Sequence, residues 1–285
     1  MEIGIGIPNS VIGTSGAQLL DWARRADKAG FSSLASIGAV SYPSYEELTV
    51  FAAAGAVTER IGFVSNVLIA PARSTAELAK QAATVQQITG GRLTLGVGVG
   101  WRESDYALTG RNFRERGQAF DSQLSDLRRA WQGQPLVEGT RPPSPDPGPG
   151  GVPLLIGGMT DAAVRRVVEH GVGWTAGGLP PEALAPYIDK VRNAWRQSRD
   201  GNPRLVGLAY FSLGDTEGAS RDYLLDYYQP MGAEIAGMIA GGALRSEEAI
   251  RAAVQAYEEV GLDELILDPT VPDPEQVDRL AEVVL

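Results

Sequence analysis

The sequence predicts an α/β fold, a single (β/α)8 TIM barrel, from three observations. Short β-rich runs alternate with longer amphipathic segments roughly eight times along the chain. The 285 residues are 44% hydrophobic and 21% charged, which suits one large barrel or two ordinary domains. Similar βα units continue on both sides of the most irregular segment, which favours a single domain over residues 1–285.

The strands are predicted from eight short runs of β-branched and aliphatic residues. They cover residues 3–7, 33–37, 61–69, 93–99, 153–157, 172–176, 205–212 and 264–268. Between them, apolar residues recur every three or four positions, as at Leu78, Ala82 and Val85, and this spacing is typical of an amphipathic helix. Several helices are expected to end at a glycine, because glycine readily closes a helix. These glycines are Gly30, Gly90, Gly133, Gly171 and Gly261.

Two segments interrupt this alternation. Residues 134–151 are dense in proline and glycine, which disfavour helix interiors and central strands, so we expect an insertion loop after the fourth βα unit. Residues 226–246 follow the seventh strand and are rich in tyrosine, methionine and glycine, which indicates short extra helices. These helices are either a lid over a pocket or a surface cap, and the pattern leaves both open.

Charge and composition exclude several classes of function. The formal net charge is −10 and only Lys28, Lys80 and Lys190 are lysines, which argues against a nucleic acid or an anionic membrane surface as partner. No cysteine is present, so thiol nucleophiles and thiolate metal sites are excluded, and no metal is expected. No apolar run is long enough to span a bilayer and the chain begins with a strand, so a cytoplasmic protein is expected.

His170 is the only histidine, so a histidine-based catalytic triad would depend on this residue alone. It precedes Gly171 at the predicted end of a helix, where an imidazole can meet the last carbonyl groups. We therefore expect a structural role for His170.

The residues that follow each predicted strand indicate the ligand, because the ligand site of a TIM barrel lies at the carboxyl ends of its strands. The fourth strand ends in GVGVGWR, whose glycines let either a flat ligand or another backbone approach, while Trp101 offers a stacking surface. The other strand ends are also rich in aromatic residues, amides and glycines, with few ionisable groups. Such a lining suits a large, planar and partly apolar cofactor, such as a flavin.

Two neighbouring strand ends carry pairs of glycines that suit a phosphate. Gly157 and Gly158 precede a helix whose start is marked by Thr160 or Asp161, and free amides at a helix N-terminus bind anions. The pair at 177 and 178 follows the next strand and would complete the cradle. The alternative is that these glycines only turn a strand into a helix. Phosphate binding is favoured because two successive strand ends share the feature.

Taken together, these features resemble the bacterial luciferase-like superfamily of flavin- or deazaflavin-dependent oxidoreductases. The resemblance covers most of the chain and is carried by GFSSLASIG, by PLLIGGMTDAAVRRVVEHGVGW and by DELILDPTVPDPEQVDRLAEVV. Its most specific part is ERIGFVSNVLIAPARSTAELAKQAATVQQITGGRLTLGVGVGWRESDY, which spans the third and fourth strands.

The resemblance implies that the isoalloxazine ring lies against a bulge in the third strand, often formed by a non-proline cis peptide. In this chain the bulge is expected near Asn66 and Val67. By the same carry-over, residues 98–101 line the ring or ribityl chain, and the glycine-rich ends of the fifth and sixth strands hold the phosphate. The implied cofactor-binding residues are Asn66, Val67, Gly98, Val99, Gly100, Trp101, Gly157, Gly158, Met159, Thr160, Gly177 and Gly178.

The chain departs from the family pattern at the residues that carry acid–base chemistry. Many members have an acidic residue and a histidine after the second strand, where this chain has Gly38 and Ala39. Deazaflavin-dependent sugar-phosphate dehydrogenases of the superfamily also have a glutamate at the place of Trp101. These differences argue against alcohol dehydrogenation, which needs a positioned base. They leave the catalytic residues unassigned, with Tyr42, Tyr45, Arg73 and Arg102 as candidate substrate contacts.

The leading hypothesis is a luciferase-like oxidoreductase that uses reduced FMN, supplied by a separate flavin reductase, to monooxygenate a small organic substrate. One alternative is hydride transfer with the deazaflavin coenzyme F420, whose tail should favour additional basic groups, of which few are visible. A second alternative is a non-catalytic flavin-binding barrel. The apolar helices over residues 45–57 and 78–88 either form a homodimer face or pack against the barrel.

Overall fold

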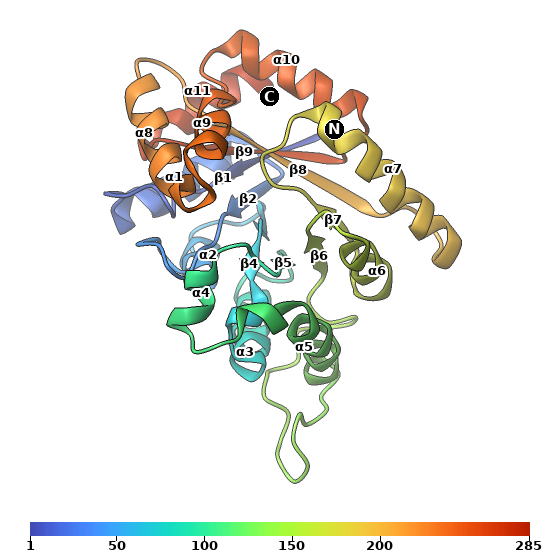
Figure 1. Cartoon of the computed structure of the whole chain (residues 1–285). Helices are drawn as coiled ribbons and strands as arrows, with labels where there is room; N and C mark the ends of the chain where they lie inside the picture. The colour runs from blue at the N-terminus through green and yellow to red at the C-terminus, as the bar shows by residue number, and fades with distance from the viewer.

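The computed structural model describes all residues, 1–285, as a closed parallel β-barrel surrounded by helices (Figure 1). The strand order is β3-β2-β1-β9-β8-β7-β6-β5-β4, and pairing of β3 with β5 closes the ring. The predicted (β/α)8 TIM barrel is therefore confirmed. None of the helices combines the length and apolar character that a membrane crossing requires.

The elements follow the predicted alternation closely. The strands are β1 Glu2–Gly6, β2 Ser33–Ser36, β3 Gly62–Ser65, β4 Leu68–Ile69, β5 Leu93–Gly98, β6 Leu154–Gly157, β7 Gly173–Thr175, β8 Arg204–Phe211 and β9 Glu264–Pro269. The helices are α1 Gly16–Ala29, α2 Glu47–Gly55, α3 Thr75–Ile88, α4 Glu103–Leu108, α5 Arg116–Trp131, α6 Asp161–His170, α7 Pro181–Ser198, α8 Glu217–Tyr228, α9 Ala233–Gly241, α10 Glu247–Glu259 and α11 Glu275–Val284, with short 3-10 turns at Ala70–Ala72, Phe113–Glu115 and Gln229–Met231.

The third predicted strand, 61–69, is two strands rather than one. The break falls at Asn66–Val67, whose peptide bond is cis, as expected. The residues of β5 that face the break are glycines, which leave room for it. A Cβ on Gly96 would lie 1.8 Å from the Ser65 carbonyl oxygen, and a Cβ on Gly98 would lie 2.9 Å from Val67. These two glycines therefore serve backbone packing, the alternative that the sequence left open beside ligand approach.

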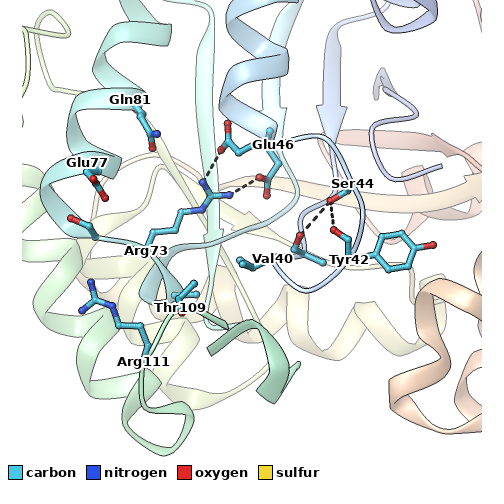
Figure 2. Close-up of a pocket in the computed structure, with 13 residues that line it drawn as sticks. Val40, Tyr42, Ser44, Glu46, Arg73, Glu77, Gln81, Thr109 and Arg111 are labelled. Atoms are coloured by element: carbon cyan, nitrogen blue, oxygen red, sulfur yellow. Dashed lines mark hydrogen bonds and ion pairs between the residues drawn. The ribbon is translucent and has the colours of Figure 1, made fainter. Parts of the chain in front are cut away.

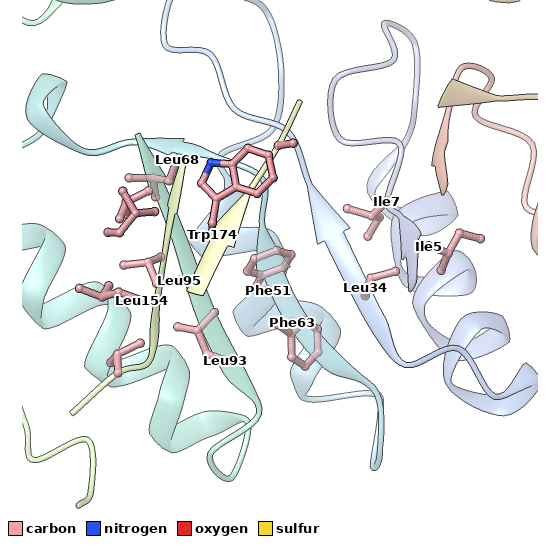
Figure 3. Packing of buried hydrophobic residues seen from close by; sticks show 14 of the residues in the cluster. Ile5, Ile7, Leu34, Phe51, Phe63, Leu68, Leu93, Leu95, Leu154 and Trp174 are labelled. Atoms are coloured by element: carbon pink, nitrogen blue, oxygen red, sulfur yellow. The ribbon is translucent and has the colours of Figure 1, made fainter. Parts of the chain in front are cut away.

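The barrel separates two apolar clusters, because successive strand residues point to opposite faces. Leu34, Leu265 and Leu267 belong to the outer cluster, which packs under the helices. Figure 3 shows part of this cluster, in which Phe51 of α2 lies 5.4 Å from the ring of Phe63. The inner cluster includes Ile266 and residues of β2, β3, β6 and β8. Residues 264, 266 and 268 of β9 therefore share the inner face of the barrel.

The two irregular segments lie at the positions predicted from the sequence. Residues 134–151 form neither helix nor strand and project beyond α5 (Figure 1). Residues 226–246 contain the end of α8, the 3-10 turn Gln229–Met231 and α9, so the expected short helices after β8 are present, but the first of them, α8, begins earlier, at Glu217. Four of the predicted glycine helix ends have a positive φ, but Gly171 has φ −87°. α6 does end at Gly171 as expected, but the chain leaves the helix in an extended conformation and enters β7 directly.

Candidate functional site

A cavity of about 170 Å³ lies at the carboxyl ends of the strands, where the ligand site of a TIM barrel is expected. Six of its sixteen lining residues are glycines and four are tyrosine or tryptophan. The lining residues are Ile37, Gly38, Asn66, Val67, Ile69, Gly100, Trp101, Gly157, Gly158, Thr175, Gly177, Gly178, Leu208, Tyr210, Tyr227 and Tyr228, and we call this space the cofactor cavity.

The structure brings most of the expected cofactor-binding residues together at this cavity. Those that line it are Asn66, Val67, Gly100, Trp101, Gly157, Gly158, Gly177 and Gly178. The other four do not. Gly98 packs against Val67, the Val99 carbonyl accepts a hydrogen bond from Tyr106, Met159 is exposed, and Thr160 caps α6.

One wall of the cavity is held by a buried hydrogen bond across the barrel. The Thr175 hydroxyl donates to Asn66 Oδ1 at 2.7 Å, and the Asn66 backbone N–H donates to the Ser36 carbonyl at 2.7 Å. Asn66 therefore has a fixed orientation beside the Val67 backbone. The polar groups of this wall are therefore its backbone, the Asn66 amide and the Thr175 hydroxyl.

The glycine pairs form an open mouth between β6, β7 and α6. Gly158 has φ +114°, which favours glycine, and its carbonyl accepts from Trp174 Nε1 at 2.8 Å. A Cβ on Gly177 would meet no atom within 4 Å, so space remains beside it. Thr160 Oγ1 accepts from the Ala163 N–H, so in the first turn of α6 only the amides of Asp161 and Ala162 have no partner within the helix. These features fit an anionic group.

An aromatic cluster from α8 covers the cavity. The Trp101 ring stacks on Tyr228 with 6.2 Å between ring centroids, and the Tyr228 hydroxyl lies 2.6 Å from that of Tyr210. Tyr227 adds a third ring, 5.0 Å from Tyr228. The sequence did not single out these tyrosines. The only signal for Tyr227 and Tyr228 was that they are adjacent tyrosines in the segment expected to be short helices, because helix docking onto the mouth is a tertiary property. Tyr210 lies within a predicted strand.

Arg102 lies beneath this cover rather than in an open site. It is 5% exposed, its guanidinium lies 4.3 Å from the Tyr227 ring centroid, and it donates to the Tyr227 carbonyl. Tyr42 packs beside the same ring and donates to Asp226 at 2.7 Å. Burial and that hydrogen bond raise the pKa of Tyr42 above its ordinary value. Both residues join the barrel to α8.

The other two candidate substrate contacts lie farther out, and none of the four lines the cofactor cavity. The Tyr45 hydroxyl donates to the Thr14 carbonyl at 2.7 Å, in an apolar groove between α1 and α2. Arg73 is held between the carboxylates of Glu46 and Glu47 (Figure 2). Substrate binding by these residues stays a prediction.

His170 ends α6, far along that helix from the mouth, and it does not cap the helix as expected. Its Nδ1 has no hydrogen-bond partner, and Arg128 donates to its carbonyl at 3.0 Å. Burial, followed by the charge of Arg128, lowers the pKa of His170. The helix end is satisfied by arginine because a guanidinium keeps its charge when partly buried.

The walls of the cofactor cavity contain no carboxylate, lysine, arginine or histidine. Their only ionisable groups are the three tyrosines. Burial raises the pKa of Tyr228 to about 12 and holds the pKa of Tyr210 and Tyr227 well above its usual range. The tyrosines are therefore neutral hydrogen-bonding groups near pH 7. The site is suited to binding and shielding a planar ring, with little acid–base capacity of its own.

A flavin fits this donor set, with one geometric condition. The cavity volume is below the roughly 300–1,000 Å³ typical of whole ligand sites. A cofactor of FMN's size would therefore have to extend from the cavity over Gly177 and Gly178 or displace the Trp101–Tyr228 cover. The open space beside Gly177 and the free amides of α6 suit the phosphate end.

Comparisons with known proteins agree with this geometry. A family model described as luciferase-like monooxygenase matches residues 1–283. An uncharacterized protein of Mycobacterium tuberculosis (strain ATCC 25618 / H37Rv) is 29% identical over 214 residues, which cover 64% of this chain and 72% of the relative. An FMNH(2)-dependent dimethylsulfone monooxygenase of Pseudomonas putida is 26% identical over 223 residues, covering 72% of this chain and 60% of that enzyme.

Solved structures show the same fold at low identity. An F420-dependent secondary alcohol dehydrogenase, in complex with an F420-acetone adduct, matches with a TM-score of 0.80 at 19% identity, covering 99% of this chain and 98% of the other. The oxygenating constituent of 3,6-diketocamphane monooxygenase from Pseudomonas putida, in complex with FMN, matches with a TM-score of 0.77 at 18% identity, covering 99% and 97%. One match carries F420 and the other FMN.

Proposed function

The chain belongs to the luciferase-like monooxygenase family, and on that premise we propose that it is a monooxygenase that uses reduced FMN on a small organic substrate. The observation that carries the proposal is the composition of the cofactor cavity. Apart from Asn66 and Thr175 its walls are glycine, aliphatic and aromatic, and no charged side chain lines it. Such a site can position and shield a reactive ring, and none of the side chains that line it is a strong base for a dehydrogenation.

Different residues of this chain would position the ring, bind the phosphate and exclude water. Val67 and Asn66 form the rigid wall for the ring, with Thr175 fixing the Asn66 amide. The glycines at the ends of β6 and β7, with the first amides of α6, would bind the phosphate. Trp101 and Tyr228 would exclude water from the ring. Bound reduced FMN supplies the electrons that activate dioxygen.

Hydride transfer with coenzyme F420 is the second candidate, because a fold neighbour that uses F420 matches as well as one that holds FMN. The charges around the mouth favour FMN. A longer acidic tail needs unpaired basic groups, but Arg73 is paired with two carboxylates and Arg102 is buried against Tyr227. A separate flavin reductase would supply the reduced FMN.

An anaerobic titration tests the proposal directly. The purified protein is titrated with oxidised FMN, reduced FMN and F420, and binding is followed by absorbance and fluorescence. Reduced FMN should bind, and oxygen uptake should then match substrate consumption across a panel of small organic compounds. Gly177→Val should weaken FMN binding at least about tenfold by filling the cradle, a loss of about 1.4 kcal/mol.

A matched control is Gly218→Val, since a Cβ at Gly218 also meets no atom within 4 Å but the position lies at the start of α8, outside the cavity lining. It should bind FMN as the wild type does. Binding of F420 alone, with substrate reduction in the absence of dioxygen, would establish the second candidate instead. Tight flavin binding without turnover would indicate a non-catalytic barrel.

A further inference from the structure

Glu47 lies between two cavities. It lines a larger cavity of about 470 Å³, the outer cavity, formed by the segment after β2, the start of α3 and the residues after α4 (Figure 2). Exposed side chains such as Glu77 and Arg111 line the same cavity, which therefore reaches solvent. On its other side, the Glu47 carboxyl lies directly behind Gly38, a residue of the cofactor cavity.

The missing side chain at position 38 is what lets this carboxyl reach the wall. A Cβ on Gly38 would lie 1.8 Å from Glu47 Oε1 and 3.1 Å from the Val67 carbonyl oxygen. The Tyr227 hydroxyl donates to the Gly38 carbonyl at 3.3 Å. Gly38, Val67 and Tyr227 all line the cofactor cavity, so the Glu47 carboxyl lies against the wall of that cavity.

The charges around Glu47 suit a group that exchanges its proton. Arg73 donates to Glu46 at 2.7 Å and to Glu47 at 2.6 Å, so one cation serves two carboxylates. Burial raises the pKa of Glu47 to about 7, and the charge of Glu46 acts in the same direction against that of Arg73. Tyr227 faces the group from α8, and Glu77 and Arg111 share the outer cavity. A pKa near the working pH is optimal for proton transfer.

We propose that Glu47 is a proton-relay residue that passes protons from solvent in the outer cavity to a ligand in the cofactor cavity, past Gly38. In the transfer the O–H bond at Oε1 breaks and the proton goes to an acceptor atom of the ligand, directly or through one water. Arg73 holds the carboxylate that remains, and a proton from the outer cavity restores the acid. The inference rests on the proposed function, which supplies the acceptor.

The test uses the oxidation of protein-bound reduced FMN by dioxygen, which needs no knowledge of the organic substrate. Anionic reduced FMN gives two electrons and its proton, and one further proton is taken up as hydrogen peroxide and oxidised FMN form. Stopped-flow absorbance measures the rate from about pH 5.5 to 8.5. The wild-type rate should change about tenfold or more around pH 7, whereas Glu47→Gln should vary less than about twofold.

Two further variants separate a relay from a structural partner of Arg73. Glu46→Gln removes the neighbouring negative charge, so the inflection should persist but move to lower pH. Gly38→Ala places a Cβ where Glu47 Oε1 lies, so the inflection should weaken although Glu47 is retained. Infrared difference spectra of wild type minus Glu47→Gln, recorded without flavin, should show a carboxyl band that disappears with a midpoint of about 7.

The outcomes are distinguishable. FMN binding with an unchanged inflection in Glu47→Gln overturns the relay and leaves the proposed function standing. Absence of the carboxyl band near neutral pH also overturns the relay, whether or not flavin binds. Failure of the wild type to bind any flavin overturns the proposed function and the relay with it.

Discussion

Glu264 and Asp268 lie four residues apart on the inner face of the same strand, β9, yet their surroundings are opposite. Glu264 is the first residue of β9 and lies at the amino ends of the strands, which we call the floor of the barrel. Its carboxylate accepts hydrogen bonds from the Ser32 and Ser33 hydroxyls at 2.6 Å and from Arg204 at 2.5 Å. Asp268, at the upper end, is 2% exposed, and its Oδ1 has no hydrogen-bond partner. Burial raises the pKa of Asp268 well above its usual range.

The two ends of the barrel differ in whether their buried carboxyl groups have hydrogen-bond partners. Buried polar groups in native proteins are nearly always paired, so an unpaired carboxyl needs an explanation. At the floor both carboxylate oxygens of Glu264 accept hydrogen bonds from neighbouring side chains. At the upper end Asp268 pairs in register with Tyr210, which lines the cofactor cavity. We infer that the hydrogen bonds at the floor stabilise the fold, and that the unpaired Asp268 carboxyl at the upper end is available to bind a ligand.

The largest expected effect is at the floor. Glu264→Leu leaves Arg204 and two serine hydroxyls without their acceptor, and breaking a buried ion pair in this way costs about 3–5 kcal/mol. Urea unfolding followed by circular dichroism measures the loss of free energy of unfolding. Asp268→Leu is the matched control and should cost much less. Equal losses for the two variants would remove the contrast between the ends of the barrel.

The floor and the upper end also differ in what the sequence could predict. Glu264 begins a strand recognised from its apolar pattern, but its partners Arg204 and Ser33 come from β8 and β2, and only the barrel's register joins them. The same register creates the cofactor cavity. Sequence reasoning found Asn66 and the glycine mouths, because each follows its own strand. It missed Tyr227, whose position depends on how α8 docks, and Tyr210, whose place in the cavity wall depends on the register of β8 with β9.

Glu47 shows why the wall behind the cavity could not be predicted. Gly38 was noted as a departure from the family pattern, and the sequence gives no sign that a carboxyl from α2 fills the space. That contact joins Gly38 to a helix residue nine positions later. It depends on the path of the loop between them, which is set by the hydrogen bond from the Tyr45 N–H to the Asn9 carbonyl and by the ion pair of Arg73 with Glu47. The strands and helices follow from local periodicity, whereas the acid near the cavity follows from packing.

The second largest effect is expected at Glu47. Its carboxyl is paired with Arg73 alone, so it has fewer partners than Glu264 and more than Asp268. Its folded pKa of about 7 is above the ordinary 4.5, so the folded state holds its proton longer than the unfolded chain does. The stabilising contribution is present below about pH 4.5 and is lost as pH rises to about 7, by about 3 kcal/mol in total. Wild type minus Glu47→Gln, from urea unfolding at several pH values, should trace this loss; a constant difference would contradict it.

A smaller effect tests the crowding around Asp268. A Cβ on Gly6 would lie 1.9 Å from Asp268 Oδ1, so Gly6→Ala should destabilise the protein by about 1–3 kcal/mol through overpacking. Thermal unfolding measures the change. Adding Asp268→Gly to Gly6→Ala removes the clashing carboxyl and should recover part of the loss. If the double variant shows only the sum of the two single losses, the two positions are not in contact.

The smallest effect on stability is expected from Asp268→Asn, and it is the most informative about the upper end. The Asp268 carboxyl makes no hydrogen bond that the substitution would break, so the free energy of unfolding at acid pH should change by less than about 1 kcal/mol. The pKa of Asp268 is raised in the folded state, so wild-type stability falls as pH rises above the ordinary range of an aspartic acid, and the variant should lack that part of the slope. Urea unfolding at several pH values measures the slope.

If Asp268→Asn instead costs as much as Glu264→Leu, then Asp268 has a structural partner, and its carboxyl is not available to bind a ligand. If stability is preserved and flavin binding or oxidation weakens, Asp268 belongs to the site that Tyr210 and Tyr228 enclose.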